Sequence, residues 1–167
     1  MKTIYRMVCT GLTSLVLGLG LTGISLAQQG TLKQQIIGTW TLASVYDVGP
    51  DGKKNSDVWG EGVKGSVAYD ASGRFTYMIM SAGRPKHTTV KPLTARTPVG
   101  PMIGYFGTYT VNEADKSVTL SIERCTFPNW EGTDRKILLT VKGDRMSQTL
   151  APTPGANIPH VEWVRAK

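Results

Sequence analysis

Hydrophobic and polar residues alternate with a period of two through most of this chain after residue 30. The alternation is clearest in 117–125, where Val118, Leu120 and Ile122 are separated by polar residues. Apolar residues at every second position are typical of a β-strand with one buried face. The pattern predicts about eight strands, over 39–48, 65–70, 74–81, 104–112, 117–125, 134–142, 145–151 and 160–165.

The first of these strands carries the largest apolar side chain of its segment. A period of two places Trp40, Leu42 and Tyr46 on one face of the strand. A tryptophan in that position is large enough to fill one end of a small barrel. A short helix over 31–36, with Thr31 as its capping residue, is predicted to precede the strand.

Short turns join most of the predicted strands, and no long helical pattern lies between them. The connection 70–73 is a short hairpin in which Gly73 is expected to adopt a positive φ. An antiparallel meander leaves two unpaired edges, and closure into an up-and-down barrel removes both. We therefore predict an all-β fold, a single up-and-down antiparallel β-barrel of about eight strands. The interior of an eight-stranded barrel holds side chains or one small ligand.

The segment 82–101 interrupts the alternation. It contains four prolines, at positions 85, 92, 98 and 101, which exclude a central strand. A loop of this length in a compact domain is usually a lid, a binding loop or a disordered segment. We expect it to border the mouth of the barrel.

The first 27 residues have the layout of a secretory signal peptide. Lys2 and Arg6 precede an apolar run, and Ser25-Leu26-Ala27 ends in small residues. A membrane anchor is the alternative, but the run is short and rich in glycine. We expect cleavage after Ala27 and export to a periplasm or beyond. One barrel domain over 28–167 remains, with no stable membrane anchor.

Composition narrows the range of partners and chemistry. The formal net charge is +7, but the basic residues are scattered and form no stripe, so no nucleic-acid partner is predicted. Cleavage would leave Cys125 as the only cysteine, either a buried small hydrophobe or a reactive thiol. The two histidines, His87 and His160, lie far apart in sequence. No metal, cofactor or catalytic motif is predicted.

Several short motifs follow one another in the order and spacing of a known family. They are Gly38-Thr39-Trp40-Thr41-Leu42, Asp51-Gly52, Tyr69-Asp70 with Gly73-Arg74, Arg84-Pro85, Gly107-Thr108-Tyr109, Pro128-Asn129-Trp130 with Gly132-Thr133, Gly143-Asp144 and Trp163. Over almost all of its mature length the chain resembles the bacterial and fungal lipocalin-like domain proteins, a family of calycin-type barrels.

The resemblance implies a barrel fold and one specific contact. In lipocalins, an arginine of the last strand packs across the tryptophan of the first strand, and Arg165 and Trp40 are the matching positions here. Members of the lipocalin-like family often carry a histidine in the strand before the Pro-Asn-Trp loop. The segment 119–123 of this chain has none. The resemblance therefore supports the family's fold for this chain more strongly than it supports any activity.

Aromatic and basic residues supply the candidates for a ligand site, because small-molecule pockets are mostly apolar with a few placed polar groups. Arg124 shares the phase of the apolar residues in its strand, so it either points inward and binds a carboxylate or reaches water at the strand end. The candidate ligand-binding residues are Tyr69, Tyr77, Arg84, Tyr109, Arg124 and Trp130. The same aromatic residues also fit an ordinary packed core.

The leading functional prediction is non-catalytic binding of a small hydrophobic or amphipathic molecule in the barrel. One alternative is an isomerase or cyclase acting on a hydrophobic metabolite, with acid–base groups such as Glu123, Arg124, Tyr109 or His160. Another is an envelope protein with a packed barrel that binds a partner through its loops. An apolar cavity favours binding, convergent polar groups favour catalysis, and a filled interior favours the third function. The oligomeric state stays open.

The leader generates a direct prediction about the mature protein. The intact mass of the exported form should correspond to a chain that begins at Gln28, because the small residues before it suit a signal peptidase. Mass spectrometry of periplasmic and culture fractions measures this. A full-length species retained in the membrane fraction would contradict it.

Overall fold

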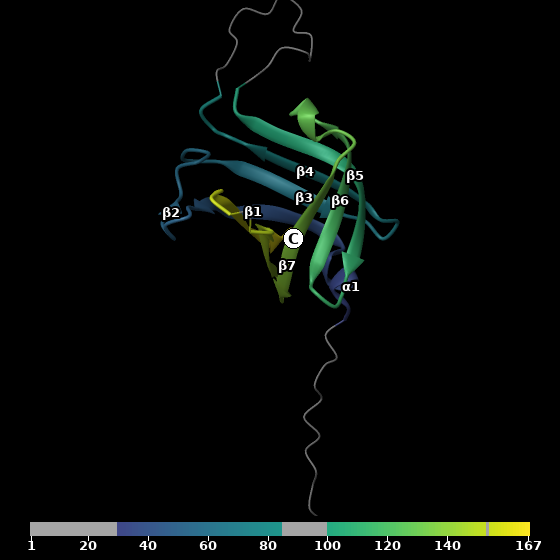
Figure 1. The fold of residues 1–167 in the computed structure, drawn as a ribbon. Helices are drawn as coiled ribbons and strands as arrows, with labels where there is room; N and C mark the ends of the chain where they lie inside the picture. The colour runs from purple at the N-terminus through teal and green to yellow at the C-terminus, as the bar shows by residue number, and fades with distance from the viewer. Residues whose placement is uncertain (1–29, 85–99, 153) are drawn as a thin grey trace, which may run out of the picture.

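The computed structural model describes residues 30–84, 100–152 and 154–167 of the chain. The predicted signal segment 1–27 and most of the predicted loop over 82–101 lie outside these residues. The described chain forms one nine-stranded sheet, a short α-helix and a 3-10 helix (Figure 1). None of its helices is long and apolar enough to cross a bilayer.

In chain order, the elements are α1 (Leu32–Ile36), β1 (Gly38–Val48), β2 (Lys54–Asn55), β3 (Lys64–Tyr69), β4 (Arg74–Met80), β5 (Met102–Asn112), β6 (Ser117–Cys125), η1 (Pro128–Trp130), β7 (Asp134–Lys142), β8 (Arg145–Leu150) and β9 (Ile158–Arg165). The predicted helix and all the predicted strands are present, with ends that differ by up to two residues. Gly73 has φ +90°, as the hairpin required.

The strands close into a barrel because β1 pairs with two partners. Its beginning pairs with β3, and the stretch from Trp40 to Val48 pairs antiparallel with β9. Sequential pairing from β3 to β9 completes a closed, eight-stranded, antiparallel barrel. The prediction of an up-and-down barrel is confirmed. The additional β2 pairs only with the end of β1, and its two residues are too few to show an alternating pattern.

A β-bulge in β1 changes which side chains face the interior. Leu42 pairs with Trp163 and Ser44 pairs with Glu162, so Ala43 is the extra residue. Val45 is consequently buried against the core, whereas Tyr46 faces outward. The prediction that Tyr46 shares a face with Trp40 is therefore wrong beyond the bulge. The outward Tyr46 ring stacks on His160, with ring centroids 5.0 Å apart.

Inward-facing side chains fill most of the barrel. Trp40 and Trp163 are both 0% exposed, and each indole N–H donates a hydrogen bond, to Ile36 O at 2.8 Å and to Gln148 Oε1 at 3.3 Å. The alternation predicted for β4 is confirmed, since Tyr77 is buried and its neighbour Met78 is 44% exposed. The core is thus a single cluster inside the ring of strands.

The helix α1 seals one end of the barrel. Thr31 caps it with its side chain, and Leu32 and Ile36 are buried against the core. Glu113, from the turn between β5 and β6, accepts hydrogen bonds from the backbone N–H groups of Leu32 and Lys33 at 2.8 and 2.9 Å. These bonds, above all the one from Lys33, lower the pKa of Glu113. Glu113 supplies an anionic partner for N–H groups that a helix start leaves unpaired.

Arg165 joins the last strand to this sealed end. Its Cζ lies 4.1 Å from the ring centroid of Trp40, so the contact implied by the family resemblance is confirmed. Its two terminal nitrogens donate to the carbonyl oxygens of Ile37 and Gln35 at 3.0 and 2.8 Å. One side chain therefore covers the tryptophan and binds carbonyl groups at the end of α1.

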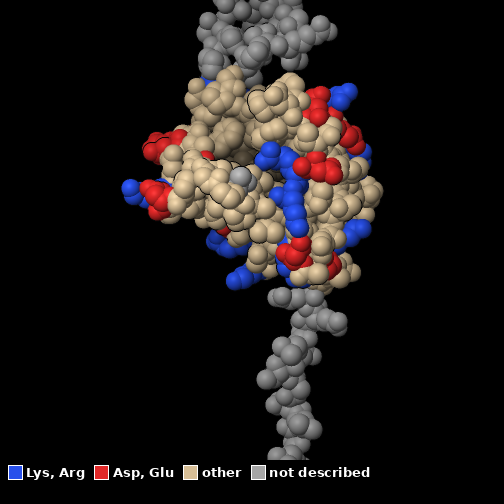
Figure 2. Space-filling view, viewed as in Figure 1, with Lys and Arg blue, Asp and Glu red and all other residues tan. Residues whose placement is uncertain are grey.

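Charged side chains of both signs share the surface. On the face in Figure 2, Lys and Arg are interspersed with Asp and Glu, and a recess in its upper part is bordered by uncharged and basic residues. Two of the ion pairs link separate elements. Arg74 of β4 pairs with Glu123 of β6 across β5, and Lys136 of β7 pairs with Asp115 of the β5–β6 turn at 2.7 Å. The Lys136 contact is the main cause that lowers the pKa of Asp115 to about 2.

The Arg165–Trp40 contact predicts a non-additive loss of stability. Trp40→Ala should lower the free energy of unfolding by about 3–5 kcal/mol, because it removes a fully buried aromatic side chain. Arg165→Ala should cost less. The double variant should lose less than the two single losses together, because both residues form one contact. Denaturant unfolding measures all three values.

Arg124→Ala provides the control, because Arg124 lies at the opposite end of the barrel and its side chain is 71% exposed. Its effect should add to that of Trp40→Ala within about 0.5 kcal/mol. Additive losses for Arg165 and Trp40 would show that the observed geometry contributes no coupling energy.

Candidate functional site

The end of the barrel opposite α1 contains a small internal cavity. Its lining residues come from η1, from the later parts of β4 and β8, and from the first parts of β5, β7 and β9. The volume of this open-end cavity is about 80 Å³. The lining residues that matter for its chemistry are Tyr77, Tyr105, Trp130, Arg135, Gln148 and Val161.

Packed aromatic rings form the wall of the open-end cavity. Tyr77 and Tyr105 stack with ring centroids 4.6 Å apart, and the edge of Trp163 meets Tyr77 at 5.3 Å. Trp130, in η1, meets Tyr105 edge-on at 6.0 Å. Binding pockets for drug-sized molecules are commonly about 300–1,000 Å³. The cavity therefore encloses only one ring or a short chain, and the rest of a larger ligand would remain in the mouth.

Three buried tyrosine hydroxyls point into the barrel. Burial raises the pKa of Tyr69, Tyr77 and Tyr105 above the ordinary value of 10.0. Arg135 acts in the opposite direction on Tyr77 and Tyr105, which places its charge near both. The Tyr69 hydroxyl is fully buried and has no hydrogen-bond partner among the described residues. All three groups are neutral at physiological pH and can donate a hydrogen bond.

Arg135 supplies the positive charge of the open end. Its Cζ lies 3.8 Å from the ring centroid of Trp130, a cation–π arrangement that fixes the guanidinium over the indole. In the part of the chain that the structure describes, no acidic side chain forms an ion pair with Arg135. Its N–H donors are therefore available to an acceptor group in the mouth.

The structure separates the four aromatic residues predicted for ligand binding. Tyr77 and Trp130 line the open-end cavity. Tyr69 and Tyr109 lie deeper in the core, with ring centroids 5.1 Å apart in an edge-to-face contact. The Tyr109 hydroxyl donates to the carbonyl oxygen of Asp70 at 2.7 Å, which ties it to the β3–β4 turn. Whether any of the four contacts a ligand stays a prediction.

The two predicted arginines lie outside the barrel. Arg84 follows β4, and its Nε donates to the carbonyl oxygen of Ser81 at 3.0 Å. Arg124 is exposed, donates to the carbonyl oxygen of Glu123 at 2.8 Å and lies 3.7 Å from a carboxylate oxygen of Glu131. The inward orientation considered for Arg124 is therefore wrong.

A bulge in β6 explains the error for Arg124. Phe106 pairs with Arg124 and Gly107 pairs with Ile122, so Glu123 is an extra residue on β6. The extra residue breaks the two-residue alternation, and Cys125 packs against the core in place of Arg124. A Cβ at Gly107 would collide with the Ser121 carbonyl oxygen, so glycine permits this close approach of the two strands.

Four of the six residues named for the open-end cavity were not among the predicted site residues: Tyr105, Arg135, Gln148 and Val161. The alternating pattern contained a signal for Arg135, which is in phase with Ile137 and Leu139 on β7. Both of these are 1% exposed. No sequence signal indicated that Arg135 would stack on Trp130, because η1 is not part of the alternating pattern.

The residues proposed for a catalytic alternative do not converge. Glu123 forms an outer ion pair with Arg74, and Arg124 also faces outward. Tyr109 is near the sealed end, and His160 stacks on Tyr46 outside the barrel. Within residues 30–84, 100–152 and 154–167, no group of three or more His, Cys, Asp or Glu residues could hold a metal ion.

A closed antiparallel barrel of eight strands, with one sealed end and one open end, defines a lipocalin-type architecture. Residues 37–162 match the lipocalin-like domain. This match covers most of the chain, so the protein belongs to the lipocalin-like domain family, and the resemblance seen in its motifs is confirmed. A comparison with curated proteins finds no match.

The solved structures similar to this chain include two with low sequence identity. One is a mutant of the fluorescent protein UnaG, 12% identical over 80% of this chain and 98% of that chain, with a TM-score of 0.39. The other is secretory abundant heat soluble protein 4 from Ramazzottius varieornatus, 13% identical over 83% of this chain and 99% of that chain, with a TM-score of 0.42.

The buried tyrosines predict a steep loss of stability in alkali. Below pH 10 both the folded and unfolded states keep these hydroxyls protonated, so their burial has no pH dependence. Above pH 10.0 the unfolded state loses protons that the folded state retains, because the pKa of each group is raised in the fold. The free energy of unfolding should fall by about 1.4 kcal/mol per pH unit for each such tyrosine.

Denaturant unfolding at several alkaline pH values, together with phenolate absorbance, measures this effect. Tyr69→Phe keeps the ring and removes one of four hydroxyls whose pKa is raised, since burial also raises the pKa of Tyr109, so it should reduce the slope by about a quarter. Titration of all tyrosines near pH 10 with the barrel still folded would contradict the burial of these groups.

Proposed function

We propose that this protein binds a small hydrophobic or amphipathic molecule at the open end of its barrel, without catalysis. The observation that carries this proposal is the guanidinium of Arg135, held over Trp130 beside the buried hydroxyls of Tyr77 and Tyr105. Neither hydroxyl has a hydrogen-bond partner among the described side chains. A ligand that inserts there would bury an apolar group among aromatic rings and meet hydrogen-bond donors at the mouth.

The chemistry of the open end defines the class of ligand. The tyrosines are neutral donors, and Arg135 is a permanent donor with a positive charge. These groups complement a carbonyl, carboxylate or other acceptor-rich group. The cavity of about 80 Å³ fits a single ring or short chain. The proposed ligand therefore joins a small apolar part to an acceptor or anionic group that remains near the mouth.

Export forms the second part of the proposal. The basic start, the apolar run and the small residues before Gln28 support a cleaved secretory leader. The barrel would then bind its ligand in the periplasm or outside the cell.

The small size of the cavity favours a second candidate, a packed barrel that binds a partner protein through its open-end loops. A filled interior stabilises the fold without holding a ligand. The two functions differ in the role of Arg135. It contacts a small molecule in the first function and the surface of a protein in the second.

Native mass spectrometry of the protein purified from its own host tests the proposal. We expect an added mass from a retained small molecule. Arg135→Gln should weaken the binding of that molecule about tenfold or more, because a hydrogen bond to a charged group contributes about 1.5–3 kcal/mol. Titration calorimetry with the identified molecule measures the change.

Arg145→Gln is the matched control, since it removes the same charge from an exposed position at the beginning of β8. It should bind the molecule as the unaltered protein does. Equal losses for Arg135→Gln and Arg145→Gln would contradict a role for Arg135 at the site. A bare chain mass in every preparation, with a co-purifying partner protein, would support the packed-barrel function.

A further inference from the structure

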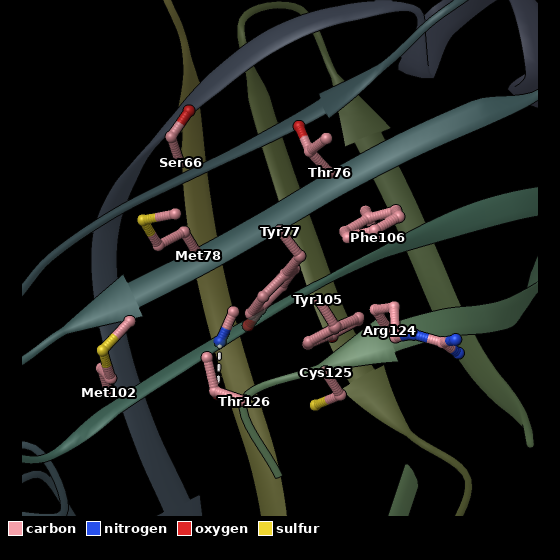
Figure 3. Close-up of a pocket in the computed structure, with 11 residues that line it drawn as sticks. Ser66, Thr76, Tyr77, Met78, Met102, Tyr105, Phe106, Arg124, Cys125 and Thr126 are labelled. Atoms are coloured by element: carbon pink, nitrogen blue, oxygen red, sulfur yellow. Dashed lines mark hydrogen bonds between the residues drawn. The ribbon is translucent and has the colours of Figure 1, made fainter. Parts of the chain in front are cut away.

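A large hollow in the described part of the protein lies outside the barrel. It crosses the outward faces of β3, β4, β5 and β6 and has a volume of about 500 Å³ (Figure 3). We call it the outer groove, lined among others by Ser66, Met78, Met102, Gly104, Phe106 and Arg124. Its volume falls within the range of pockets that enclose a small organic molecule, and the open-end cavity is several times smaller.

Gly104 creates the floor of the outer groove. A Cβ at this position would meet Thr126 Cγ2 at 3.6 Å, the Tyr77 carbonyl oxygen at 3.8 Å and the Met78 terminal methyl at 3.9 Å, which are ordinary contacts. Its φ is not among the positive values of the chain. Neither packing nor backbone conformation therefore requires glycine here. The missing side chain leaves a gap between Met78 and Phe106, where the Gly104 N–H donates to Thr126 Oγ1 at 3.0 Å.

The walls of the outer groove expose apolar side chains to solvent. Met78 is 44% exposed and Phe106 is 40% exposed. Both are large apolar side chains on the outward face of strands that are paired on both sides. Methionine side chains adapt to the shape of a bound molecule, and a contiguous exposed apolar patch often marks a binding surface. Figure 3 shows Met78 and Met102 on one side of the groove and the guanidinium of Arg124 at the other.

The charged residues that line the outer groove and one adjoining hollow are basic. Arg124 is the charged residue of the outer groove. An adjoining hollow of about 360 Å³ shares Ser66 and Met78 with it and carries Lys64 and Arg84. No acidic residue lines either hollow. One terminal nitrogen of Arg124 donates to the Glu123 carbonyl oxygen and lies 3.7 Å from a carboxylate oxygen of Glu131. Among the described residues, the other terminal nitrogen and Nε of Arg124 form no hydrogen bond. An apolar trough that ends at an arginine complements an amphipathic anion.

We propose that the outer groove is a second binding site and that it takes a small amphipathic anion. The apolar body of the ligand lies on the Gly104 backbone between Met78, Met102 and Phe106. Its carboxylate, sulfonate or similar group pairs with Arg124. The site is on the opposite side of the sheet from the open-end cavity, so this proposal does not depend on the proposed function.

Titration of the purified protein with anilinonaphthalene sulfonate, an aromatic anion, tests the proposal. With methionine methyl groups labelled for NMR, the Met78 and Met102 signals should shift on binding. The Met146 signal should not, because Met146 is 0% exposed inside the barrel. The indole N–H of Trp130 reports on the open-end cavity in the same sample and should not shift.

Three variants identify the contacts. Gly104→Val fills the floor with a side chain that suits a β-strand, and it should raise the Kd of the probe at least about tenfold. Arg124→Gln should raise it by about tenfold. Lys64→Gln removes an equal charge from the adjoining hollow and should change the Kd less than about twofold. Gly104→Ala gives a smaller obstruction if the valine variant does not fold, and should raise the Kd to a lesser degree.

Several results would overturn the proposal. Equal losses for Arg124→Gln and Lys64→Gln would indicate only general attraction of an anion to a basic surface. A shift confined to Trp130 would place the probe in the open-end cavity. Unchanged affinity in Gly104→Val would also exclude the site.

Discussion

The pairing of β1 with β9 is the constraint on which the rest of this structure depends. Trp40 and Arg165 face each other as direct partners in that pairing, so closure of the barrel and formation of their cation–π contact are the same event. Arg165 also binds the backbone at the end of α1. An open meander would expose two strand edges and would lose the docking site of the helix. Barrel closure, core packing and the sealed end therefore form one cooperative unit.

A barrel closed around so many aromatic rings has little room for a guest. Trp40, Trp163 and the tyrosines occupy the space that a wider barrel leaves open, and only about 80 Å³ remains near Trp130. The groups that could bind a ligand consequently lie at the rim and on the outer surface of the barrel. Arg135 lies beside apolar groups at the rim, and Arg124 lies beside exposed apolar groups on the outer surface. The filled core provides a rigid support for both places.

The strand order and the barrel could be predicted because alternation, turns and motif spacing all indicated the same fold. The side-chain directions failed at two points, Tyr46 and Arg124, and a β-bulge precedes each. A bulge depends on two strands together. The one in β6 requires Gly107 on β5, and no pattern within β6 shows it. Most of the open-end site was similarly hidden. Arg135 is in phase with the core, but its contact depends on Trp130, which lies in η1 outside the alternating strands.

The position of the sealed end has a practical consequence for handling this protein. The described chain enters the barrel through α1 and leaves it after Arg165, and both points are at the sealed end. A tag, a surface linker or a fused reporter attached beyond either point would extend away from the open end. The protein could thus be immobilised on a sensor by the end that follows Arg165, with the mouth still facing the solution.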